Sequence, residues 1–330
     1  MNDAALYFTA PETVEIRSVT VGSPDESELL VDTRVSAISA GTEMLVYRDE
    51  TPSGLPADET IDGLGEEFSY PIRYGYAASG VVSDVGADVD PDWLGRTVFS
   101  FAPHQTRFRA DPDDVVPLSE ETSPETGALV PSVETATNVV LDAAPRIGER
   151  VVVLGAGVIG LCVTRLLASF PLAELVAVDP IGRRRGLALE MGADRATTPE
   201  EVVETVDDAD LVIELSGRPA ALNDAIDVVG YDARIVVGSW YGTKREPIDL
   251  GGRFHRDRID IVSTQVSTIS PELRGRWSRE RRLDTALNWV NRIDVDELIT
   301  HRVPFERAAE AYDLLDSEPE AAVQVVLEYR

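Results

Sequence analysis

The stretch from residue 148 to residue 179 constrains the fold of this chain more than any other. The apolar run Val151 to Leu154 leads directly into glycines at the spacing G-x-G-x-x-G. An apolar helical pattern follows, and a second apolar run, Leu175 to Val178, ends in Asp179. This order of strand, glycine turn, helix, strand and acid predicts a parallel βαβ unit that binds a dinucleotide. The alternative is an ordinary crossover between parallel strands.

Each part of this pattern has a physical role in holding a dinucleotide. The first glycine permits a tight turn, the second lets the backbone approach the pyrophosphate, and the third lets the helix pack closely on the strand. The helix N-terminus then faces the phosphates. Asp179, about 20 residues beyond the turn, can accept both ribose hydroxyls of the adenosine half. The predicted cofactor contacts of the turn are Gly155, Ala156, Gly157, Val158, Ile159 and Gly160.

The charge balance restricts the partners of the chain. It has 330 residues with a formal net charge of -29, and Lys244 is its only lysine. Because the acids are scattered, we interpret them as a carboxylate shell that keeps the protein soluble in high salt, rather than as an acidic surface for a partner. Nucleic acids and anionic membranes need a basic face, so the composition argues against both.

Cysteine content and the absence of long apolar runs predict a cytoplasmic protein. Cys162 is the only cysteine, so no intrachain disulfide can form. We expect it to be a small buried residue. The sequence shows no signal-peptide pattern at its start, and no apolar run is long enough to span a bilayer.

The pattern of the chain changes near residue 132. The part before it reads as short strands, such as 29–35 and 81–85, with a polar loop from Thr51 to Gly65. Beyond it, helices alternate with apolar strands, which predicts a doubly wound parallel sheet. Its predicted strands are 151–154, 175–178, 211–215, 234–239 and 259–264. Helices are predicted near 186–191 and 219–229, and a further one opens at 197–201.

The C-terminal part differs again. An amphipathic helix from Phe305 to Tyr312 is followed by a strand from Val323 to Leu327. We expect this piece to pack back onto the first domain. The predicted domains are residues 1–131 plus 267–330 and, between them, residues 132–266.

This organisation resembles the medium-chain dehydrogenase/reductase superfamily over nearly the whole chain. Its marks are the glycine turn and the runs Ala40–Glu43, Tyr74–Val82 and Ile235–Ser239. The resemblance implies an α/β chain with an N-terminal β-rich GroES-like domain, a Rossmann domain, and a homodimer or homotetramer. The strings SAISAGTE, FAPHQTRF and STQVSTISPELRGRW are similar to the subgroup that contains bacteriochlorophyllide hydroxyethyl dehydrogenase. That subgroup implies oxidation of a secondary alcohol with a nicotinamide cofactor.

The chain departs from the zinc members of the superfamily at their metal ligands. Where those members carry cysteine, histidine and acidic residues, this chain has Ala40, Tyr76, Ala77 and Pro131. Zinc needs thiolate, imidazole or carboxylate ligands, and one cysteine cannot form a four-cysteine structural site. We therefore predict a zinc-independent protein. The alternative is an improvised site of His104 with Glu43 or Glu134.

Without zinc, side chains must polarise the substrate oxygen and manage one proton. Thr42 matches the proton-relay hydroxyl of the superfamily, or it caps its own loop. Tyr76 either directs its hydroxyl at the substrate oxygen or only lines the pocket. His104 is the predicted acid or base near neutral pH, with a simple loop histidine as the alternative. Glu134 is either a base or an acid favoured in a first helical turn.

Further cofactor contacts follow from the resemblance. Thr135 is implied near the nicotinamide, and Arg184 matches a basic position that contacts the ribose. The set is completed by Ser216, Gly238 and Ser239. The carboxylate of Asp179 repels a 2′-phosphate, whereas the arginines at 183–185 attract one. We predict NAD as the cofactor, with NADP as a possible alternative.

A second group of residues suits a bulky substrate that carries a carboxylate or phosphate. It consists of Trp240, Tyr241, Gln265, Arg276 and Trp277. The alternative is a subunit interface.

The sequence favours a zinc-independent NAD(P)-dependent oxidoreductase that interconverts a secondary alcohol and a ketone on a small or medium-sized organic molecule. One alternative is a zinc-free enone or quinone reductase of the same superfamily. The other is a nicotinamide-binding sensor or structural protein without catalysis.

Overall fold

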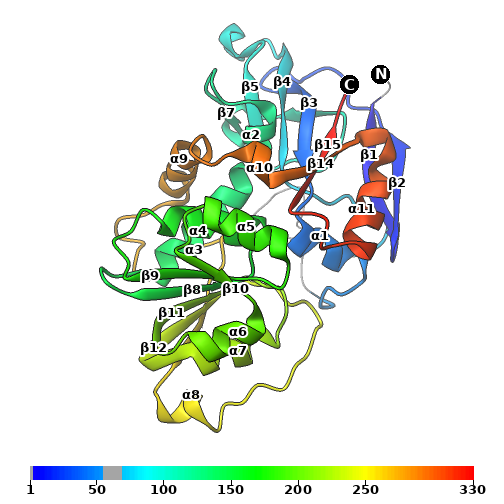
Figure 1. The fold of residues 1–330 in the computed structure, drawn as a ribbon. Coiled ribbons are helices and arrows are strands. Elements are labelled where there is room, and N and C mark those ends of the chain that lie inside the picture. Colours follow the sequence, from blue (N-terminus) through cyan, green and yellow to red (C-terminus); the bar gives the residue numbers. More distant parts are fainter. Residues whose placement is uncertain (1–2, 55–68) are drawn as a thin grey trace. The chain divides into compact units, whose positions relative to one another are not determined.

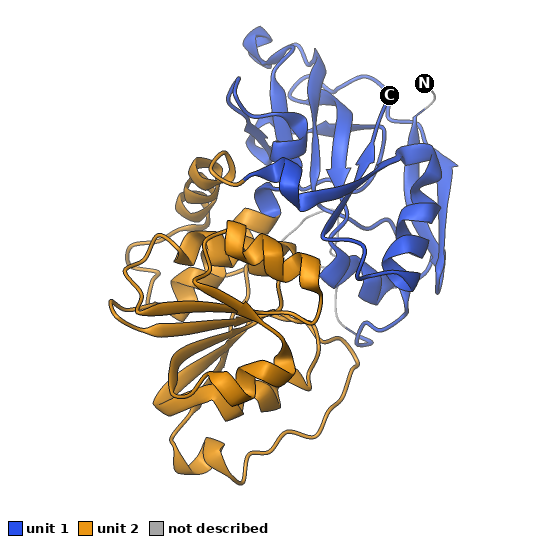
Figure 2. Cartoon of the chain, in the orientation of Figure 1, with its two compact units in different colours: residues 1–131, 294–330 blue, residues 132–293 orange. Residues whose placement is uncertain are grey.

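The structure, a computed structural model, describes residues 3–54 and 69–330. The chain forms two compact units, coloured separately in Figure 2. Unit 1 comprises Met1–Pro131 and Asp294–Arg330, and unit 2 comprises Ser132–Ile293. The division after Pro131 coincides with the expected one. Most of the loop expected from Thr51 to Gly65 lies outside the described residues.

The second division differs from the expected one. We predicted a return to the first domain at residue 267, but residues 267–293 belong to unit 2. Helix α9 (Arg279–Val290) explains the difference, because its Arg282 is bonded to Glu134 and Asn138 of helix α3 (Val130–Ala143). These partners are 148 and 144 residues away in sequence, so no local pattern announces the contact.

Unit 2 is built on a six-stranded parallel sheet with the order β10-β9-β8-β11-β12-β13. Its strands are β8 (Arg150–Leu154), β9 (Glu174–Val178), β10 (Arg195–Thr197), β11 (Ala209–Glu214), β12 (Val229–Val237) and β13 (Asp260–Ser263). The chain moves outwards from β8 to β10, returns, and moves outwards from β11 to β13 on the other side. The carboxyl ends of β8 and β11 therefore mark the topological switch point, where such sheets bind ligands.

The apolar runs of the sequence explain this sheet. Both faces of a doubly wound sheet are covered, so its central strands read as continuous buried runs, as Val151 to Leu154 does. Figure 1 shows α4 (Val158–Leu167) and α5 (Gly182–Glu190) on one face, and α6 (Pro199–Thr205) and α7 (Ala221–Val228) on the other. The short α8 (Arg253–Arg256) precedes β13. The doubly wound prediction is confirmed, although the three-residue strand β10 was too short to predict.

Unit 1 contains a two-stranded sheet and a seven-stranded sheet. The first is the hairpin of β1 (Ala4–Ala10) and β2 (Thr13–Ser18). The second has the order β14-β15-β3-β4-β5-β7, with β6 paired to β3. Its strands are β3 (Leu29–Ala37), β4 (Ala78–Val85), β5 (Thr97–Ser100), β6 (Arg107–Ala110), β7 (Val115–Pro117), β14 (Ile299–Pro304) and β15 (Gln324–Glu328). The α-helices here are α1 (Ala40–Tyr47), α2 (Pro124–Ala128), α10 (Val295–Leu298) and α11 (Ala308–Ser317).

The predicted return of the C-terminus to the first domain is confirmed. Strand β15 pairs antiparallel with β3, with Val326 opposite Ala37. Helix α11 turns its apolar stripe inwards, and its Tyr312 packs edge-on against Phe8 at 5.2 Å and stacks on Tyr47 at 5.6 Å between ring centroids. The last residues of the chain thus complete the core of unit 1.

No helix in the described part of the chain is long and apolar enough to cross a membrane. The cytoplasmic location, the adaptation to salt, the absence of nucleic-acid partners and the homo-oligomer stay predictions.

Candidate active site

The glycine turn after β8 has the local geometry that a dinucleotide requires. Gly155 has a φ of +97°, and a Cβ there would lie 2.7 Å from the carbonyl carbon of Leu215. At Gly160 a Cβ would lie 1.9 Å from the carbonyl oxygen of Gly155, so only glycine lets helix and turn meet. At Gly157 a Cβ would meet nothing within 4 Å. The backbone at the second glycine is therefore open to a ligand.

Helix α4 begins at this open position without a side-chain cap. Its N-cap residue is Gly157, which has no side chain to offer. By helix geometry the N–H groups of Val158, Ile159 and Gly160 have no acceptor within the helix, and the positive end of the helix dipole lies with them. Ala156 adjoins them in the turn. The residues present therefore fit the diphosphate of a dinucleotide.

Asp179 fixes the turn in addition to offering a carboxylate. The residue is 3% exposed, and its oxygens accept hydrogen bonds from the backbone N–H of Ala156 at 2.9 Å and of Ile181 at 2.8 Å. A guanidinium nitrogen of Arg184 lies 3.9 Å from the same carboxylate. Arg185 instead donates to the carbonyl oxygen of Asp179 at 2.8 Å. The structure thus brings Asp179 and Arg184 together, and their predicted contacts with the ribose stay predictions.

The other predicted cofactor residues of unit 2 follow neighbouring strands. Ser216 follows β11, and Gly238 and Ser239 follow β12. The backbone N–H of Gly217 donates to Ser239 Oγ at 2.9 Å, which ties the two loops together. Thr135 lies half-buried in α3. The roles of these residues stay predictions.

In unit 1, two of the predicted catalytic residues belong to one cluster of hydroxyl groups. The Tyr76 hydroxyl donates to Ser39 Oγ at 2.6 Å and lies 3.2 Å from Thr42 Oγ1. All three residues are half-buried. Ser39 is the N-cap residue of α1 but makes no side-chain cap bond. Hydroxyl groups in contact can pass a proton along their chain, so this arrangement suits proton transfer.

His104 is not placed as an acid or base that faces a substrate. The residue is fully buried, with Nε2 at 3.0 Å from Glu43 Oε2 and Nδ1 at 2.6 Å from Ser36 Oγ. A Cβ at Gly75 would lie 2.6 Å from Cδ2 of the ring, so the backbone also packs against it. Because both ring nitrogens are engaged inside unit 1, the predicted acid/base role is corrected: His104 supports the site from within the core.

The surroundings of His104 form a buried network that reaches the hydroxyl cluster. The Tyr312 hydroxyl donates to Glu43 Oε2 at 2.5 Å, and the backbone N–H of Ser39 donates to Glu43 Oε1 at 2.7 Å. The Tyr329 hydroxyl lies 2.8 Å from Ser36 Oγ. Burial and the charge of Glu43 raise the pKa of Tyr312 well above its usual value, so this phenol stays a donor. The network therefore fixes Ser39, the partner of Tyr76.

The side chains of the described residues do not present a set of donors that fits a zinc ion. Among residues 3–54 and 69–330, no group of three or more histidine, cysteine, aspartate or glutamate side chains could hold a metal. His104 and Glu43 are bonded to each other, and Glu134 is paired with an arginine of its own unit. Ala40 offers only a methyl group, and the Tyr76 hydroxyl is bonded to Ser39.

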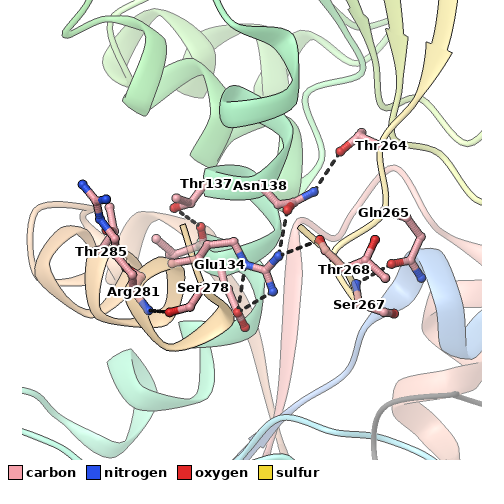
Figure 3. A network of polar contacts seen from close by, with 12 residues as sticks. Glu134, Thr137, Asn138, Thr264, Gln265, Ser267, Thr268, Ser278, Arg281 and Thr285 are labelled. Atoms are coloured by element: carbon pink, nitrogen blue, oxygen red, sulfur yellow. Dashed lines mark hydrogen bonds and ion pairs between the residues drawn. The ribbon is translucent and has the colours of Figure 1, made fainter. Parts of the chain in front are cut away.

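Glu134 belongs to a buried polar network, so its predicted role as a base is also corrected. Its Oε1 accepts hydrogen bonds from Arg282 at 2.9 and 3.1 Å. Arg282 donates to Asn138 Oδ1 at 2.7 Å, and Asn138 donates to Thr264 Oγ1 at 2.9 Å, as Figure 3 shows for the labelled partners. Arg282 is 2% exposed, and a buried guanidinium needs the carboxylate of Glu134 as its counter-charge.

The second group of predicted residues makes mostly local contacts. Tyr241 donates to Glu214 at 2.6 Å, Gln265 accepts from the backbone N–H of Ser267, and the guanidinium of Arg281 lies 4.3 Å from the ring centroid of Trp277. Trp240 is 37% exposed. Their joint role with Arg276 in binding a bulky substrate stays a prediction.

Five residues support the predicted ones through hydrogen bonds and were not themselves predicted as site residues. They are Ser36, Glu214, Arg282, Tyr312 and Tyr329. One of them carried a readable signal: Glu214 is a charged residue inside the apolar run of a parallel strand. The others depend on contacts between distant parts of the chain.

The chain is similar in sequence to known dehydrogenases and reductases. Residues 158–281 match the family model of zinc-binding dehydrogenases. The D-guloside 3-dehydrogenase of Escherichia coli K12 is 26% identical, over 97% of this chain and 98% of that protein. The D-xylulose reductase of Saccharomyces cerevisiae is 23% identical, over 98% and 97%. Similarity to the bacteriochlorophyllide subgroup stays a prediction.

The fold is also that of a solved dehydrogenase. The short chain alcohol dehydrogenase of Escherichia coli CFT073, in complex with NADH, superimposes with a TM-score of 0.78 at 19% identity. The match covers 99% of each chain, so it includes both units.

Proposed function

We propose that the protein is a zinc-independent, NAD(P)-dependent enzyme of the medium-chain dehydrogenase/reductase superfamily that interconverts a secondary alcohol and a ketone. The match of residues 158–281 to the zinc-binding dehydrogenase model and the two dehydrogenase and reductase relatives support this proposal. The observation that carries this proposal is the contact of Tyr76, at a position where zinc members have a ligand, with Ser39 and Thr42. Tyr76, Ser39 and Thr42 thus form a cluster of hydroxyl groups at a position that matches a metal ligand of the zinc members.

Unit 2 holds the cofactor in this proposal. The open backbone at Gly157 and the uncapped start of α4 bind the diphosphate. Asp179 accepts the ribose hydroxyls of the adenosine half, which favours NAD over NADP because a carboxylate repels a 2′-phosphate. The solved relative in complex with NADH supports a nicotinamide cofactor.

The residues of unit 1 manage the proton. The cofactor, when bound, accepts or returns the hydride. In alcohol oxidation the substrate oxygen must also lose a proton. The Tyr76 hydroxyl accepts that proton as it donates its own to Ser39 Oγ, and the half-buried serine releases its proton to solvent water. Thr42, at 3.2 Å, holds the tyrosine hydroxyl in position or extends the chain.

Sugars and polyols are the first substrates to examine. Both full-length relatives named above act, by name, on a guloside or on xylulose. Fold alone does not set a substrate, so this choice rests on those two names.

The test is a substrate panel in molar salt. Polyols, sugars, glycosides and simple secondary alcohols are incubated with NAD+ or NADP+ and a metal chelator, and reduced nicotinamide is followed by absorbance. We expect turnover on at least one secondary alcohol, with NAD+ preferred. Turnover only in the reduction of enones or quinones would favour the related reductase function, and tight NADH binding without any turnover would favour the non-catalytic alternative.

A further inference from the structure

Glu214 is a buried carboxylate at the topological switch point of unit 2. It is the last residue of β11 and lies opposite Leu154 of β8, the residue that precedes the glycine turn. It has no exposed surface. Burying a charged side chain in a strand that is covered on both faces costs free energy. An acid at this point therefore needs hydrogen-bond partners that offset this cost.

Three donors surround this carboxylate. The backbone N–H of Ser216 donates to Oε1 at 2.7 Å, the Ser216 hydroxyl donates to the same oxygen, and the Tyr241 hydroxyl donates to Oε2 at 2.6 Å. Burial and the charge of Glu214 raise the pKa of Tyr241 well above its usual value, so the phenol stays a donor. All three partners thus direct donors at the carboxylate oxygens, which accept them.

Among the described residues, no cation forms an ion pair with this carboxylate. All three partners are neutral groups, and within the described chain no arginine, lysine or histidine forms an ion pair with Glu214. The contrast within unit 2 is Glu149, whose two oxygens each lie 2.9 Å from Arg234. Glu214 therefore places a carboxylate that has neutral hydrogen-bond donors, and no paired cation among the described residues, in a buried position where charges act more strongly than at the surface.

This charge lies on the side of the switch point away from Asp179. Asp179 ends β9 and would hold the adenosine half, so the other half of a dinucleotide extends over β11 and β12. The loop after β11 also meets the glycine turn, since a Cβ at Gly155 would lie 2.7 Å from Cα of Ser216. Glu214 thus borders the part of the crevice that would receive the nicotinamide.

We propose that Glu214 makes unit 2 bind the oxidised, positively charged nicotinamide in preference to the reduced, neutral one. This inference rests on the proposed function, because it requires a nicotinamide cofactor. The attraction exists only for NAD+, whereas repulsion between Glu214 and the pyrophosphate is the same for NAD+ and NADH. The effect therefore appears in the ratio of the two dissociation constants, which a purely structural role would leave unchanged.

The test is to measure Kd for NAD+ and for NADH with wild-type protein and with Glu214→Gln, by calorimetry and fluorescence in the absence of substrate. Glutamine keeps the shape and an acceptor oxygen but removes the charge. We expect Kd for NAD+ to rise about fivefold to thirtyfold relative to Kd for NADH, the range for two unit charges about 16 to 8 Å apart at an effective dielectric constant of about 20. A ratio that shifts by threefold or more in this direction supports the proposal, and any smaller or opposite shift overturns it.

Two further variants test whether a change in the ratio of the two dissociation constants comes from the charge of Glu214. Glu149→Gln removes a carboxylate from the opposite, amino end of the same sheet and should leave the ratio at its wild-type value. If Glu214→Gln does not fold, the double variant Glu214→Leu with Tyr241→Phe removes the charge together with its tyrosine donor and allows the same measurement. Failure of wild-type protein to bind either nucleotide would reject the proposed function, whereas binding of both with an unchanged ratio in the variant would reject only the role of Glu214.

Discussion

The hydroxyl of Tyr76 lies 3.2 Å from the hydroxyl of Thr42, although the two residues are 34 positions apart, with Thr42 in α1 and Tyr76 in the segment before β4. If this contact serves proton transfer, Tyr76→Phe should lower kcat about a hundredfold. The dissociation constant for NADH should stay within twofold, because the cofactor contacts lie in unit 2. Tyr231→Phe, which alters a tyrosine that is 69% exposed, is the matched control. A kcat within threefold of wild type would remove Tyr76 from the mechanism.

We expect His104 to contribute to the stability of the fold and not to act as an acid or base. Removing the ring in His104→Ala takes one hydrogen-bond partner from the buried Glu43, which keeps Tyr312 and Ser39 as donors. The loss should cost about 1 to 3 kcal/mol of unfolding free energy. Denaturant unfolding at neutral pH measures this directly. If the variant were as stable as wild type but inactive, this prediction would be wrong and an acid/base role for His104 would be supported.

Asp179 should decide between the two nicotinamide cofactors. Its replacement in Asp179→Ser removes the negative charge that repels a 2′-phosphate and leaves Arg184 beside the site. We expect the ratio of Kd for NADPH to Kd for NADH to fall at least about tenfold, a difference of 1.4 kcal/mol. Asp207→Asn, on the surface of the same unit, should not change it. Because Asp179 also holds the N–H of Ala156, both affinities can weaken, and a constant ratio would refute the assignment.

Asp142 gives a prediction for the pH dependence of stability. Burial raises its pKa, and the hydrogen bonds from Thr264 and Asn138 and the charge of Arg282 offset this only in part. A pKa raised by folding means that the protonated form is favoured in the fold. Its stabilising contribution is therefore present below the unfolded pKa and lost as pH rises through the folded pKa.

Asp142→Asn should accordingly raise Tm by a few degrees at pH 7, about 1 kcal/mol or less. The gain should shrink as pH falls through the carboxyl range, where wild-type Asp142 becomes neutral. Asp284→Asn, at an exposed position of α9, is the control and should have little effect at either pH. A variant less stable than wild type at pH 7 would show that the hydrogen bonds outweigh the cost of burying the charge.

Local patterns account for the parts of the structure that could be predicted. The glycine turn, its flanking strands and Asp179 lie within about 30 residues, and their spacing is set by the βαβ unit itself. The helix at Pro199 was also readable, because Thr198 accepts from the backbone N–H of Glu201 as an N-cap residue does.

Contacts between distant segments account for what could not be predicted. Arg282 lies 148 residues from Glu134, and Tyr329 lies 293 residues from Ser36. His104 was misjudged for the same reason: a histidine in a loop sequence gives no sign that Glu43 and Ser36 enclose it. Such partners are fixed by the tertiary fold, and single-sequence patterns carry no information about them.

The proposed mechanism requires that the protein oxidise alcohols without zinc. The most direct measurement is the zinc content of purified protein by elemental analysis, together with turnover of the same sample before and after chelation. A zinc-independent enzyme should contain substoichiometric zinc, and chelation should leave its turnover unchanged. One zinc per chain, with activity lost on chelation and restored by added zinc, would contradict it.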